Sequence, residues 1–418
     1  MAPKISFHSF VSVLLAVFLI PQVSCKKDDN PSTTRKTLIQ SKLQEVVDSE
    51  LAAYQEKVPG YPGGICMNII TKDGSFFVSS GYNSPVTDGI HFRAASNTKT
   101  LTSTAILLLY QQDKLNINHK ITDTIPGTHD TYVPNTPEYN IPFKNSITIL
   151  DLLRHRAGVF DIANETIPDT VTANLPYKNF NYIGYIQETQ PTHTFTFDEL
   201  VNVVAKTRLY YFLPGTAYHY SNTGYSILGK IIERVSGKSY QRFLMEDIIK
   251  PSQMMNSSMP VSGDDRNLPE PFLPGFVLYE NQNYDVTQSN MSANVAEGNL
   301  ITTPDDLSRF LRNLISGKGL LNPHIVNNIM MSYLPTGNIN SGGYGCGLTY
   351  TNKLGYGHTG AHEGYLSLMA SDPDSDFTIV IFTNAWNLNG GMTSLIDQVL
   401  GLLENTSYKT KSIVTSNQ

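Results

Sequence analysis

A serine and a lysine stand three residues apart where an apolar helical pattern begins. The segment Ser96–Lys99 is followed by Leu101 and by the apolar run Ala105–Leu109. Positions three apart lie on one face of a helix, so the Ser96 hydroxyl and the Lys99 amine can meet. A serine hydroxyl is a weak nucleophile until a base takes its proton, and a lysine becomes that base when burial depresses its pKa. The spacing predicts a nucleophile and its activator, although the pattern is common and recurs at Ser24.

A second candidate pair is Tyr220 and Asn222, which lie between a Pro214-Gly215 turn and a helical pattern at Tyr225–Val235. In an extended segment, residues two apart point the same way, so both side chains can face one cleft. A phenol can carry a proton, and a carboxamide can hold a substrate carbonyl. The Tyr-x-Asn pattern recurs elsewhere in the chain, so its place before a helix is what makes this copy a candidate.

The third candidate is His358-Thr359-Gly360, in a glycine-rich stretch between two strand-like segments. Glycines in such a stretch let a substrate backbone approach a strand edge. The structural alternative is a hairpin capped by a histidine, and this alternative is favoured for an isolated copy of the motif.

The order Ser-x-x-Lys, Tyr-x-Asn and His-Thr-Gly resembles the serine β-lactamase and D-alanyl-D-alanine carboxypeptidase family. Tyr-x-Asn as the second motif is typical of its branch of class C β-lactamases and secreted carboxypeptidases, whereas class A enzymes have Ser-Asp-Asn there. The flanks Phe92–Ala95, Ile147–Gly158 and Asn299–Phe310 also match family stretches. The resemblance extends over about Leu38–Leu403 and implies a penicillin-recognising serine hydrolase.

On the helical side, the resemblance implies a role for each motif residue. Ser96 would be acylated, and Lys99 and Tyr220 would share the proton transfers. Asn222 would bind the substrate amide. His155 also matches a family position, and its expected role is structural.

On the strand side, the resemblance places His358, Thr359 and Gly360 against the substrate. The backbone N–H groups of Ser96 and Ala361 would form the oxyanion hole, where losing one donor typically costs on the order of 100-fold in rate. The histidine replaces the lysine that is usual in class C β-lactamases. A lysine attracts a substrate carboxylate strongly, whereas a histidine with a pKa of about 6.5 is largely neutral near pH 7.

The resemblance therefore implies acyl transfer from a peptide or ester substrate, with no cofactor. A peptidase or amidase resembling the D-Ala-D-Ala carboxypeptidases, acting on D-amino-acid peptides or peptidoglycan stem peptides, is the first interpretation. A carboxylesterase or a β-lactamase on the same site is the alternative, and a lipid-anchored binding protein with a disused site is a third. Two departures from the family bear on the cleft. An acid and an amide occur in Ala296–Asn299, where small residues are usual, and the segment at 160–196 is long.

The elements that would position these residues come from both ends of the chain. Near the start, the patterns predict a helix and two strands joined by an Asp-Gly turn, at Thr37–Glu56, Gly64–Thr71 and Ser75–Gly81. Near the end they predict three strands and a helix, at Gly345–Thr351, Gly364–Ser371, Phe377–Asn384 and Gly391–Leu403. We expect an α/β (α+β) fold: an antiparallel sheet flanked by terminal helices (about 37–95 and 321–405), with a mainly helical lobe inserted (about 96–320).

The first residues predict export. An apolar run at Val11–Ile20 has the length of a secretory signal and is too short to span a membrane as a mature helix. Val23-Ser24-Cys25 follows it and resembles the lipobox of bacterial lipoproteins, in which the cysteine is lipidated; an ordinary signal peptide cut nearby is the alternative. We expect a signal peptide at 1–25, a tether at 26–36, the hydrolase domain at 37–405 and a tail at 406–418. The expected location is the bacterial cell envelope, with the lipid anchor as the membrane contact.

The composition of the chain bears on whether it binds nucleic acid or metal ions and whether its cysteines pair. The 418 residues carry a formal net charge of −6 with scattered Lys and Arg, so no basic surface for nucleic acid is predicted. Cysteine and histidine residues show no metal-ligand spacing, so no metal is expected. Besides Cys25, the chain has Cys66 and Cys346, which we expect to be buried thiols, although their number neither demands nor excludes a disulfide.

Overall fold

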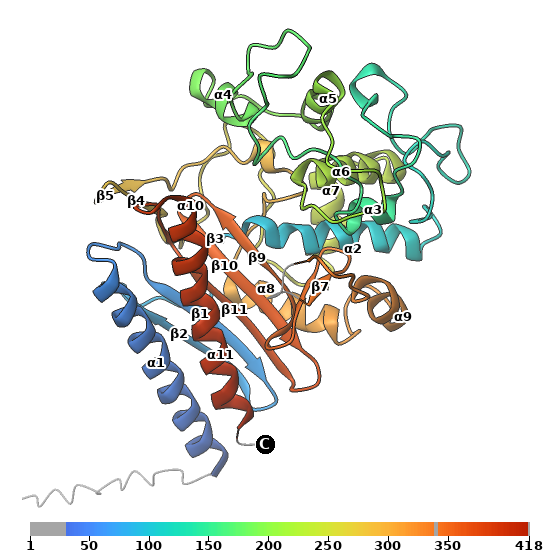
Figure 1. Ribbon diagram of the computed structural model, residues 1–418. Helices are drawn as coiled ribbons and strands as arrows, with labels where there is room; N and C mark the ends of the chain where they lie inside the picture. The colour runs from blue at the N-terminus through green and yellow to red at the C-terminus, as the bar shows by residue number, and fades with distance from the viewer. Residues whose placement is uncertain (1–30, 338–341, 417–418) are drawn as a thin grey trace, which may run out of the picture.

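The computed structural model describes residues 31–337 and 342–416, and the predicted signal run, Cys25 and the start of the tether lie outside them. Its centre is a seven-stranded antiparallel sheet in the order β2-β1-β11-β10-β9-β8-β7 (Figure 1). The strands come from both parts of the chain: β1 (Ile65–Thr71), β2 (Gly74–Ser80), β7 (Gly343–Tyr344), β8 (Thr349–Thr351), β9 (Gly355–His362), β10 (Tyr365–Asp372) and β11 (Phe377–Thr383). The predicted fold class is thereby confirmed.

Helices cover both faces of this sheet. Helices α1 (Pro31–Lys57) and α11 (Gly401–Thr415) pack side by side on one face, and α8 (Pro304–Ile315) packs on the other (Figure 1). The alternation along β1 explains this arrangement, because Ile65, Met67 and Ile69 join the apolar core under α1 and α11. The residue between the last two, Asn68, instead donates to the Ser308 hydroxyl of α8 at 2.7 Å.

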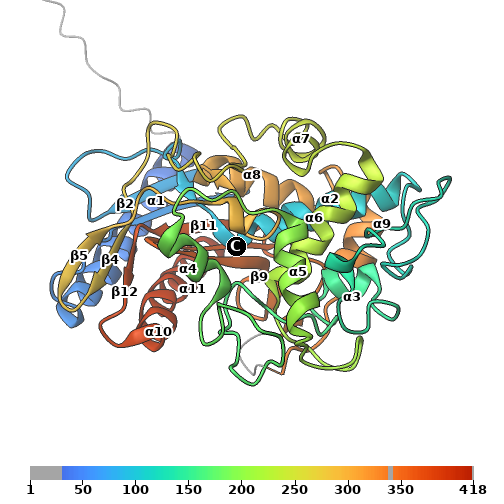
Figure 2. The same ribbon diagram turned by 90° about the horizontal axis from the view of Figure 1, so that it is seen from above.

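Most of the remaining helices form a lobe beside the sheet (Figure 2). They are α2 (Thr98–Gln111), α3 (Ile149–Leu153), α4 (Tyr182–Thr189), α5 (Phe197–Thr207), α6 (Asn222–Ser236), α7 (Tyr240–Phe243) and α9 (Pro323–Ile325), with the 3₁₀ turns η1 (Ala95–Asn97), η2 (Pro137–Tyr139) and η4 (Ser292–Asn294) and the π-helical turns η3 (Leu244–Ile249) and η5 (Val326–Met330). Helix α2 runs through the lobe and is buried from Thr98 to Leu109. It is the central element of this core.

Two small sheets join the lobes. One has the strand order β12-β4-β5, with β4 (Phe276–Tyr279), β5 (Gln282–Asp285) and β12 (Ala385–Asn387), and the other pairs β3 (Phe92–Arg93) with β6 (Ile301–Thr302). The β3–β6 pair brings the chain just before Ser96 beside the segment that follows Ala296–Asn299. Between β3 and α2, the η1 turn contacts β9 and β10, so this turn connects the main sheet to α2.

The structure differs from the sequence expectations at three places. Helix α1 already begins at Pro31, inside the expected tether, and Arg35 on it pairs with Asp73 in the β1–β2 turn at 3.0 Å. The last helix starts at α10 (Gly391–Thr393), continues through the π-helical η6 (Ser394–Leu400) and ends with α11 at Thr415, so the expected tail at 406–418 is largely helical. Buried Thr406, Ser407 and Thr410 on α11 explain this extension, because they face the sheet core.

The third difference concerns the His-Thr-Gly motif, which lies within strand β9 and not between strands. Its glycines disfavour a strand when considered alone, but β10 and β8 flank β9 and supply its pairing partners. Gly357 is required by packing, because a Cβ there would come within 1.9 Å of the Met369 carbonyl oxygen.

Two further observations concern the described residues. Cys66 and Cys346 are both free and buried, as expected. Within residues 31–337 and 342–416, no helix combines the length and the apolar composition that crossing a bilayer requires.

Candidate active site

The Ser96 hydroxyl lies at a sharp turn that enters helix α2. Ala95 just before it has a φ of 49°, a left-handed conformation that an L-residue adopts only at some cost. Strand β9 packs tightly against this turn, since a Cβ on Gly360 would come within 2.1 Å of the Ala94 carbonyl oxygen. The turn is therefore fixed between β9 and α2, with Ser96 facing the cleft.

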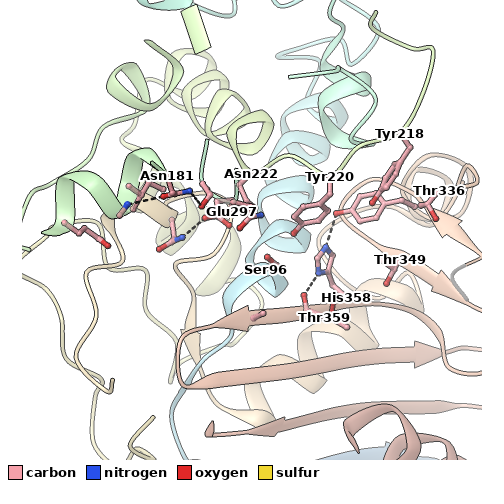
Figure 3. Close-up of a pocket in the computed structure, with 18 residues that line it drawn as sticks. Ser96, Asn181, Tyr218, Tyr220, Asn222, Glu297, Thr336, Thr349, His358 and Thr359 are labelled. Atoms are coloured by element: carbon pink, nitrogen blue, oxygen red, sulfur yellow. Dashed lines mark hydrogen bonds between the residues drawn. The ribbon is translucent and has the colours of Figure 1, made fainter. Parts of the chain in front are cut away.

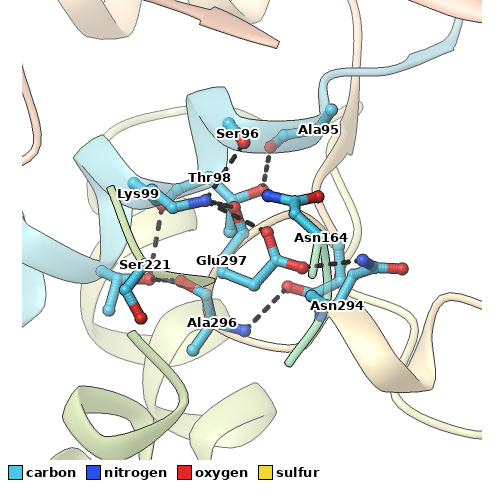
Figure 4. A network of polar contacts seen from close by, with 12 residues as sticks. Ala95, Ser96, Thr98, Lys99, Asn164, Ser221, Asn294, Ala296 and Glu297 are labelled. Atoms are coloured by element: carbon cyan, nitrogen blue, oxygen red, sulfur yellow. Dashed lines mark hydrogen bonds and ion pairs between the residues drawn. The ribbon is translucent and has the colours of Figure 1, made fainter. Parts of the chain in front are cut away.

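Lys99 is one helical turn further on and has no solvent exposure. Its Nζ donates to Ser96 Oγ at 3.1 Å, to the Glu297 carbonyl oxygen at 2.8 Å and to Glu297 Oε2 at 3.1 Å (Figure 4). Burial lowers the pKa of Lys99, while the neighbouring Glu297 carboxylate opposes that shift. The predicted Ser–Lys contact is thus formed, and it includes a carboxylate that the motif did not contain.

Tyr220 stands across from Lys99, whose Nζ lies 4.7 Å from the centre of the phenol ring. Burial raises the pKa of Tyr220 well above its usual value, and a hydrogen bond with Ser96 opposes that rise. Helix α6 begins directly after this tyrosine because Ser221 caps it by accepting from the Gly224 N–H. Hydroxyl, amine and phenol therefore form one cluster through which a proton can pass.

His155 supports this cluster from behind. Its Nδ1 accepts from the Ser221 backbone N–H at 3.1 Å, and its ring lies 4.2 Å from the Tyr220 ring. Burial, followed by repulsion from Lys99, lowers the pKa of His155 well below its usual value, so the ring is neutral. These contacts agree with a structural role that holds Tyr220 in place.

His358 on β9 lines the same cleft as Ser96 and is also buried. Its Nδ1 lies 2.5 Å from the Thr359 carbonyl oxygen, and its Nε2 lies 3.0 Å from the Tyr344 hydroxyl. The carbonyl can only accept, so Nδ1 carries the proton and the Tyr344 hydroxyl donates to Nε2. Burial and, next, the charge of Lys99 lower the pKa of His358 to about 3, so the imidazole is neutral near pH 7.

A cleft of about 690 Å³ opens above these residues. Figure 3 shows Asn181 at one end, Thr336 and Thr349 at the other, and Ser96 and His358 between them. One end is formed by α4 and its neighbours (Ala163, Asn164, Asn181, Ile183, Gly184, Gln187, Asn294), and the other by tyrosines and threonines (Tyr218, Tyr344, Thr336, Thr349, Thr359). No lysine or arginine lines the cleft among the described residues, and Glu297 is its one acidic residue there.

The structure brings most of the predicted site residues to this cleft. Ser96, Tyr220, Asn222, His358, Thr359 and Ala361 line it, and Lys99 lies directly beneath Ser96. Gly360 does not line the cleft. Its missing side chain makes room for Ala94, Asn97 and Ser367 of the protein itself, which is a different use of glycine from the close substrate approach that we expected.

Asn222 and Asp161 carry two further features of the site. Asn222 Oδ1 is buried and has no partner in the protein, which suits a group that awaits a donor. Asp161 is buried beside it, and burial raises the pKa of this carboxyl to about 6. The Asp161 carboxyl accepts from the backbone N–H of Asn222, the first residue of α6, and also from the Ala163 backbone and the Asn164 side chain.

Three site residues escaped the motif analysis: Glu297, Tyr344 and Tyr218. The sequence marks Glu297 as a departure from the family pattern but indicates no partner for its carboxylate. Tyr218 could have been found by extending the two-residue alternation back from Tyr220. Tyr344 gave only a weak signal, a tyrosine within the glycine-rich stretch Gly342–Gly347. In the part of the chain that the structure describes, no group of three His, Cys, Asp or Glu residues is placed to hold a metal ion.

Comparison with known families and proteins adds independent information. The family model described as Beta-lactamase matches residues 60–403. Protein flp of Staphylococcus aureus is 31% identical over 201 residues, which cover 46% of this chain and 34% of that protein. N-acetylmuramyl-L-alanine amidase of Bacillus subtilis is 26% identical over 231 residues, which cover 52% of this chain and 45% of the amidase. The chain thus matches less than half the length of these relatives.

Solved structures with the same fold include two amidases. The D-stereospecific amidohydrolase from Streptomyces sp. has a TM-score of 0.67 at 24% identity, and the match covers 86% of this chain and 97% of that one. The D-amino acid amidase from Ochrobactrum anthropi SV3, complexed with L-phenylalanine amide, has a TM-score of 0.65 at 22% identity and covers 88% and 99%. At these identities the likeness establishes the fold.

Proposed function

Because this chain belongs to the beta-lactamase family, we propose that it is a serine hydrolase that cleaves amide bonds through an acyl-enzyme on Ser96. The observation that carries this proposal is the buried contact between Ser96 Oγ and Lys99 Nζ, at 3.1 Å on the floor of a polar cleft. A serine that meets a buried amine has the base it needs to become a nucleophile. The amidases of the same fold, from Streptomyces sp. and Ochrobactrum anthropi SV3, point to amides as the substrate class.

In the proposed reaction, the substrate carbonyl lies above Ser96 with its oxygen near the backbone N–H groups of Ser96 and Ala361. As Ser96 Oγ bonds to the carbonyl carbon, its proton moves to Lys99. Tyr220 then gives its phenolic proton to the leaving nitrogen as the C–N bond breaks, and Lys99 passes the proton that it took from Ser96 to Tyr220. In the second half of the reaction a water molecule attacks the acyl carbon, the bond between Ser96 Oγ and that carbon breaks, and a proton from the water reaches Ser96 Oγ through Lys99 and Tyr220.

The electrostatics of the cleft favour substrates without a free carboxylate beside the scissile bond. Binding a carboxylate strongly requires a cation, and the described cleft residues include no lysine or arginine, while His358 is neutral. We therefore favour a peptidase or amidase acting on neutral amides, including D-amino-acid amides and internal bonds of peptidoglycan stem peptides. A carboxypeptidase preference for a terminal D-alanine carboxylate is the weaker expectation.

Hydrolysis of esters or β-lactams on the same serine is the alternative, since the same cluster can attack any accessible acyl group. A substrate panel distinguishes these functions: amides of D- and L-amino acids, D-Ala-D-Ala peptides, p-nitrophenyl esters and a β-lactam. We expect the highest kcat/KM for neutral D-amino-acid amides, with the Ser96→Ala variant as the blank. Turnover of esters alone would assign an esterase, and turnover that persists in Ser96→Ala would exclude the proposed site.

We also propose that the protein is exported and held in the bacterial cell envelope by a lipid on Cys25. The support is the apolar run Val11–Ile20 and the lipobox-like Val23-Ser24-Cys25. Detergent phase partitioning of the wild type and of Cys25→Ala tests this location. We expect the wild type in the detergent phase and the variant in the aqueous phase, and an aqueous wild type would contradict the anchor.

A further inference from the structure

The buried Lys99 amine has an acceptor for each of its possible N–H donors. An ammonium has three donors, and the three acceptors within reach are Ser96 Oγ, the Glu297 carbonyl and Glu297 Oε2, at 3.1, 2.8 and 3.1 Å. In this arrangement the ammonium donates to the serine. A protonated amine cannot accept the Ser96 proton, so one proton must leave this cluster before the serine can be activated.

Glu297 is built into that position by its own surroundings. Its Oε1 accepts from Asn294 Nδ2 at 2.7 Å, which leaves Oε2 for the lysine (Figure 4). Ala296 has a φ of 72°, and this left-handed turn directs both the carbonyl and the carboxylate of Glu297 at the same nitrogen. Thr102 fixes the turn by donating to the Ala296 carbonyl at 2.6 Å. The contact between Lys99 and Glu297 is thus fixed by the backbone conformation as well as by the attraction of opposite charges.

Other titratable groups face Lys99, but none of them takes the place of Glu297. The phenols of Tyr220 and Tyr225 offer their ring faces at 4.7 and 5.5 Å. The remaining ones act only through space: Asp161 as a further acidic group, and His155 and His358 as neutral rings whose protonation Lys99 disfavours. Glu297 is the carboxylate in direct contact with the amine.

We propose that Glu297 is a positioning residue that sets the pH at which Lys99 becomes available as a base. This inference rests on the proposed acyl-enzyme function. At low pH the carboxylate keeps the third proton on Lys99. Loss of that proton to water leaves a neutral amine beside the carboxylate. The amine then takes the Ser96 proton as the Oγ–C bond forms, and passes a proton towards the leaving nitrogen as the C–N bond breaks.

The test is the pH profile of kcat/KM in the wild type and in Glu297→Gln, with a neutral amide as substrate. Glutamine keeps the shape of the side chain and can still accept from Lys99, but it carries no charge to hold the extra proton. Since a neighbouring opposite charge typically shifts a pKa by about one unit or more, we expect the acid limb of the variant to lie about one pH unit or more lower. At pH values below both midpoints the variant should then be about tenfold faster than the wild type.

Two controls make this result specific. Glu363→Gln removes the same charge from the exposed residue that follows β9, and its profile should match the wild type. Glu297→Ala introduces a small residue of the kind usual in the family and should move the acid limb in the same direction. It replaces Glu297→Gln as the test if that variant does not fold. Thermal unfolding monitored by circular dichroism identifies the folded variants.

An acid limb that stays in place, or moves to higher pH, in a folded Glu297 variant would overturn the proposal, even if kcat falls. Failure of the underlying function looks different. In that case the wild type itself would form no adduct on Ser96 with a fluorophosphonate, or Ser96→Ala would keep its activity, whatever the pH profile of the Glu297 variants.

Discussion

Lys99 and His358 are two buried nitrogen bases at the cleft that holds Ser96, and their hydrogen-bond partners differ in kind. Lys99 is surrounded by acceptors, one of them a carboxylate, whereas His358 lies between one acceptor, the Thr359 carbonyl, and one donor, the Tyr344 hydroxyl. Both bases are buried, and burial lowers the pKa of both. An acceptor-only shell stabilises a cation, while a shell with one donor and one acceptor fits a neutral imidazole. Because burial disfavours the charged form of both bases, the difference between their hydrogen-bond partners decides which of the two can carry charge.

Removing the amine of Lys99 should have the largest effect on activity. Without the amine, the Ser96 hydroxyl has no group to take its proton, so Lys99→Ala should lower the rate of acylation more than about 1000-fold, as should Ser96→Ala. Intact-protein mass spectrometry after incubation with a fluorophosphonate measures this as loss of a single adduct. Labelling of another serine, with Ser96→Ala still fully active, would refute the assignment of the whole site.

Tyr220→Phe should have the next largest effect. The variant keeps the ring against Lys99 and His155 but removes the hydroxyl that would give the leaving group its proton. For amides we expect a loss on the order of 100-fold in kcat. Esters with a good leaving group, such as p-nitrophenol, should lose much less, because that group departs without a proton. Equal losses for amides and esters would show that Tyr220 acts on the serine and not on the leaving group.

His358→Lys should replace the neutral imidazole in the cleft with a positively charged amine. A lysine there would supply the cation that the described cleft residues lack, and a charge-assisted hydrogen bond contributes about 1.5–3 kcal/mol. We expect kcat/KM for carboxylate-bearing D-Ala-D-Ala peptides to rise about tenfold relative to the matching amides. An unchanged ratio would mean that this side chain does not meet the leaving-group side of the substrate.

Tyr344→Phe should give the smallest effect on activity and a measurable one on stability. The change leaves the buried His358 Nε2 without its donor, which should cost about 1–3 kcal/mol of unfolding free energy near pH 7. The folded-state pKa of His358, about 3, lies below its ordinary value of 6.5, so this histidine favours folding above the unfolded pKa. The contribution of His358 to the free energy of unfolding should therefore be lost as pH falls from about 6.5 towards 3. Chemical denaturation at pH 7 and pH 4 measures both effects, and a Tyr344→Phe variant as stable as the wild type would remove this phenol from the support of His358.

The sequence predicted a contact best where both contacting residues lie in one short segment. The Ser96–Lys99 contact follows from helix geometry alone, and helix α2 (Thr98–Gln111) contains the apolar run Ala105–Leu109 that indicated it. The sheet drawn from both chain ends also followed from local alternation. Family resemblance then linked three motifs that are weak when taken separately.

Contacts between segments that are distant in the sequence could not be predicted from local patterns. Glu297 is 198 positions from Lys99, and nothing in its neighbourhood indicates that its carboxylate faces an amine. Tyr344 and His358 belong to different strands of a sheet whose order is not written in local patterns. The glycines of β9 suggested an open strand edge, yet Gly357 and Gly360 are small because neighbouring backbone fills the space. Such positions are decided by tertiary packing.

The orientation of helix α1 has a consequence for where the protein can work. The helix begins at the same end of the sheet as the end of α11, away from α4 and the cleft (Figure 1). Its 27 residues rise about 1.5 Å each, so it runs for about 40 Å along the sheet, packed against β2 and α11. With a lipid on Cys25, the molecule would stand on the membrane with its cleft turned outward. Its cleft would then meet substrates on the side of the molecule that faces away from the lipid surface.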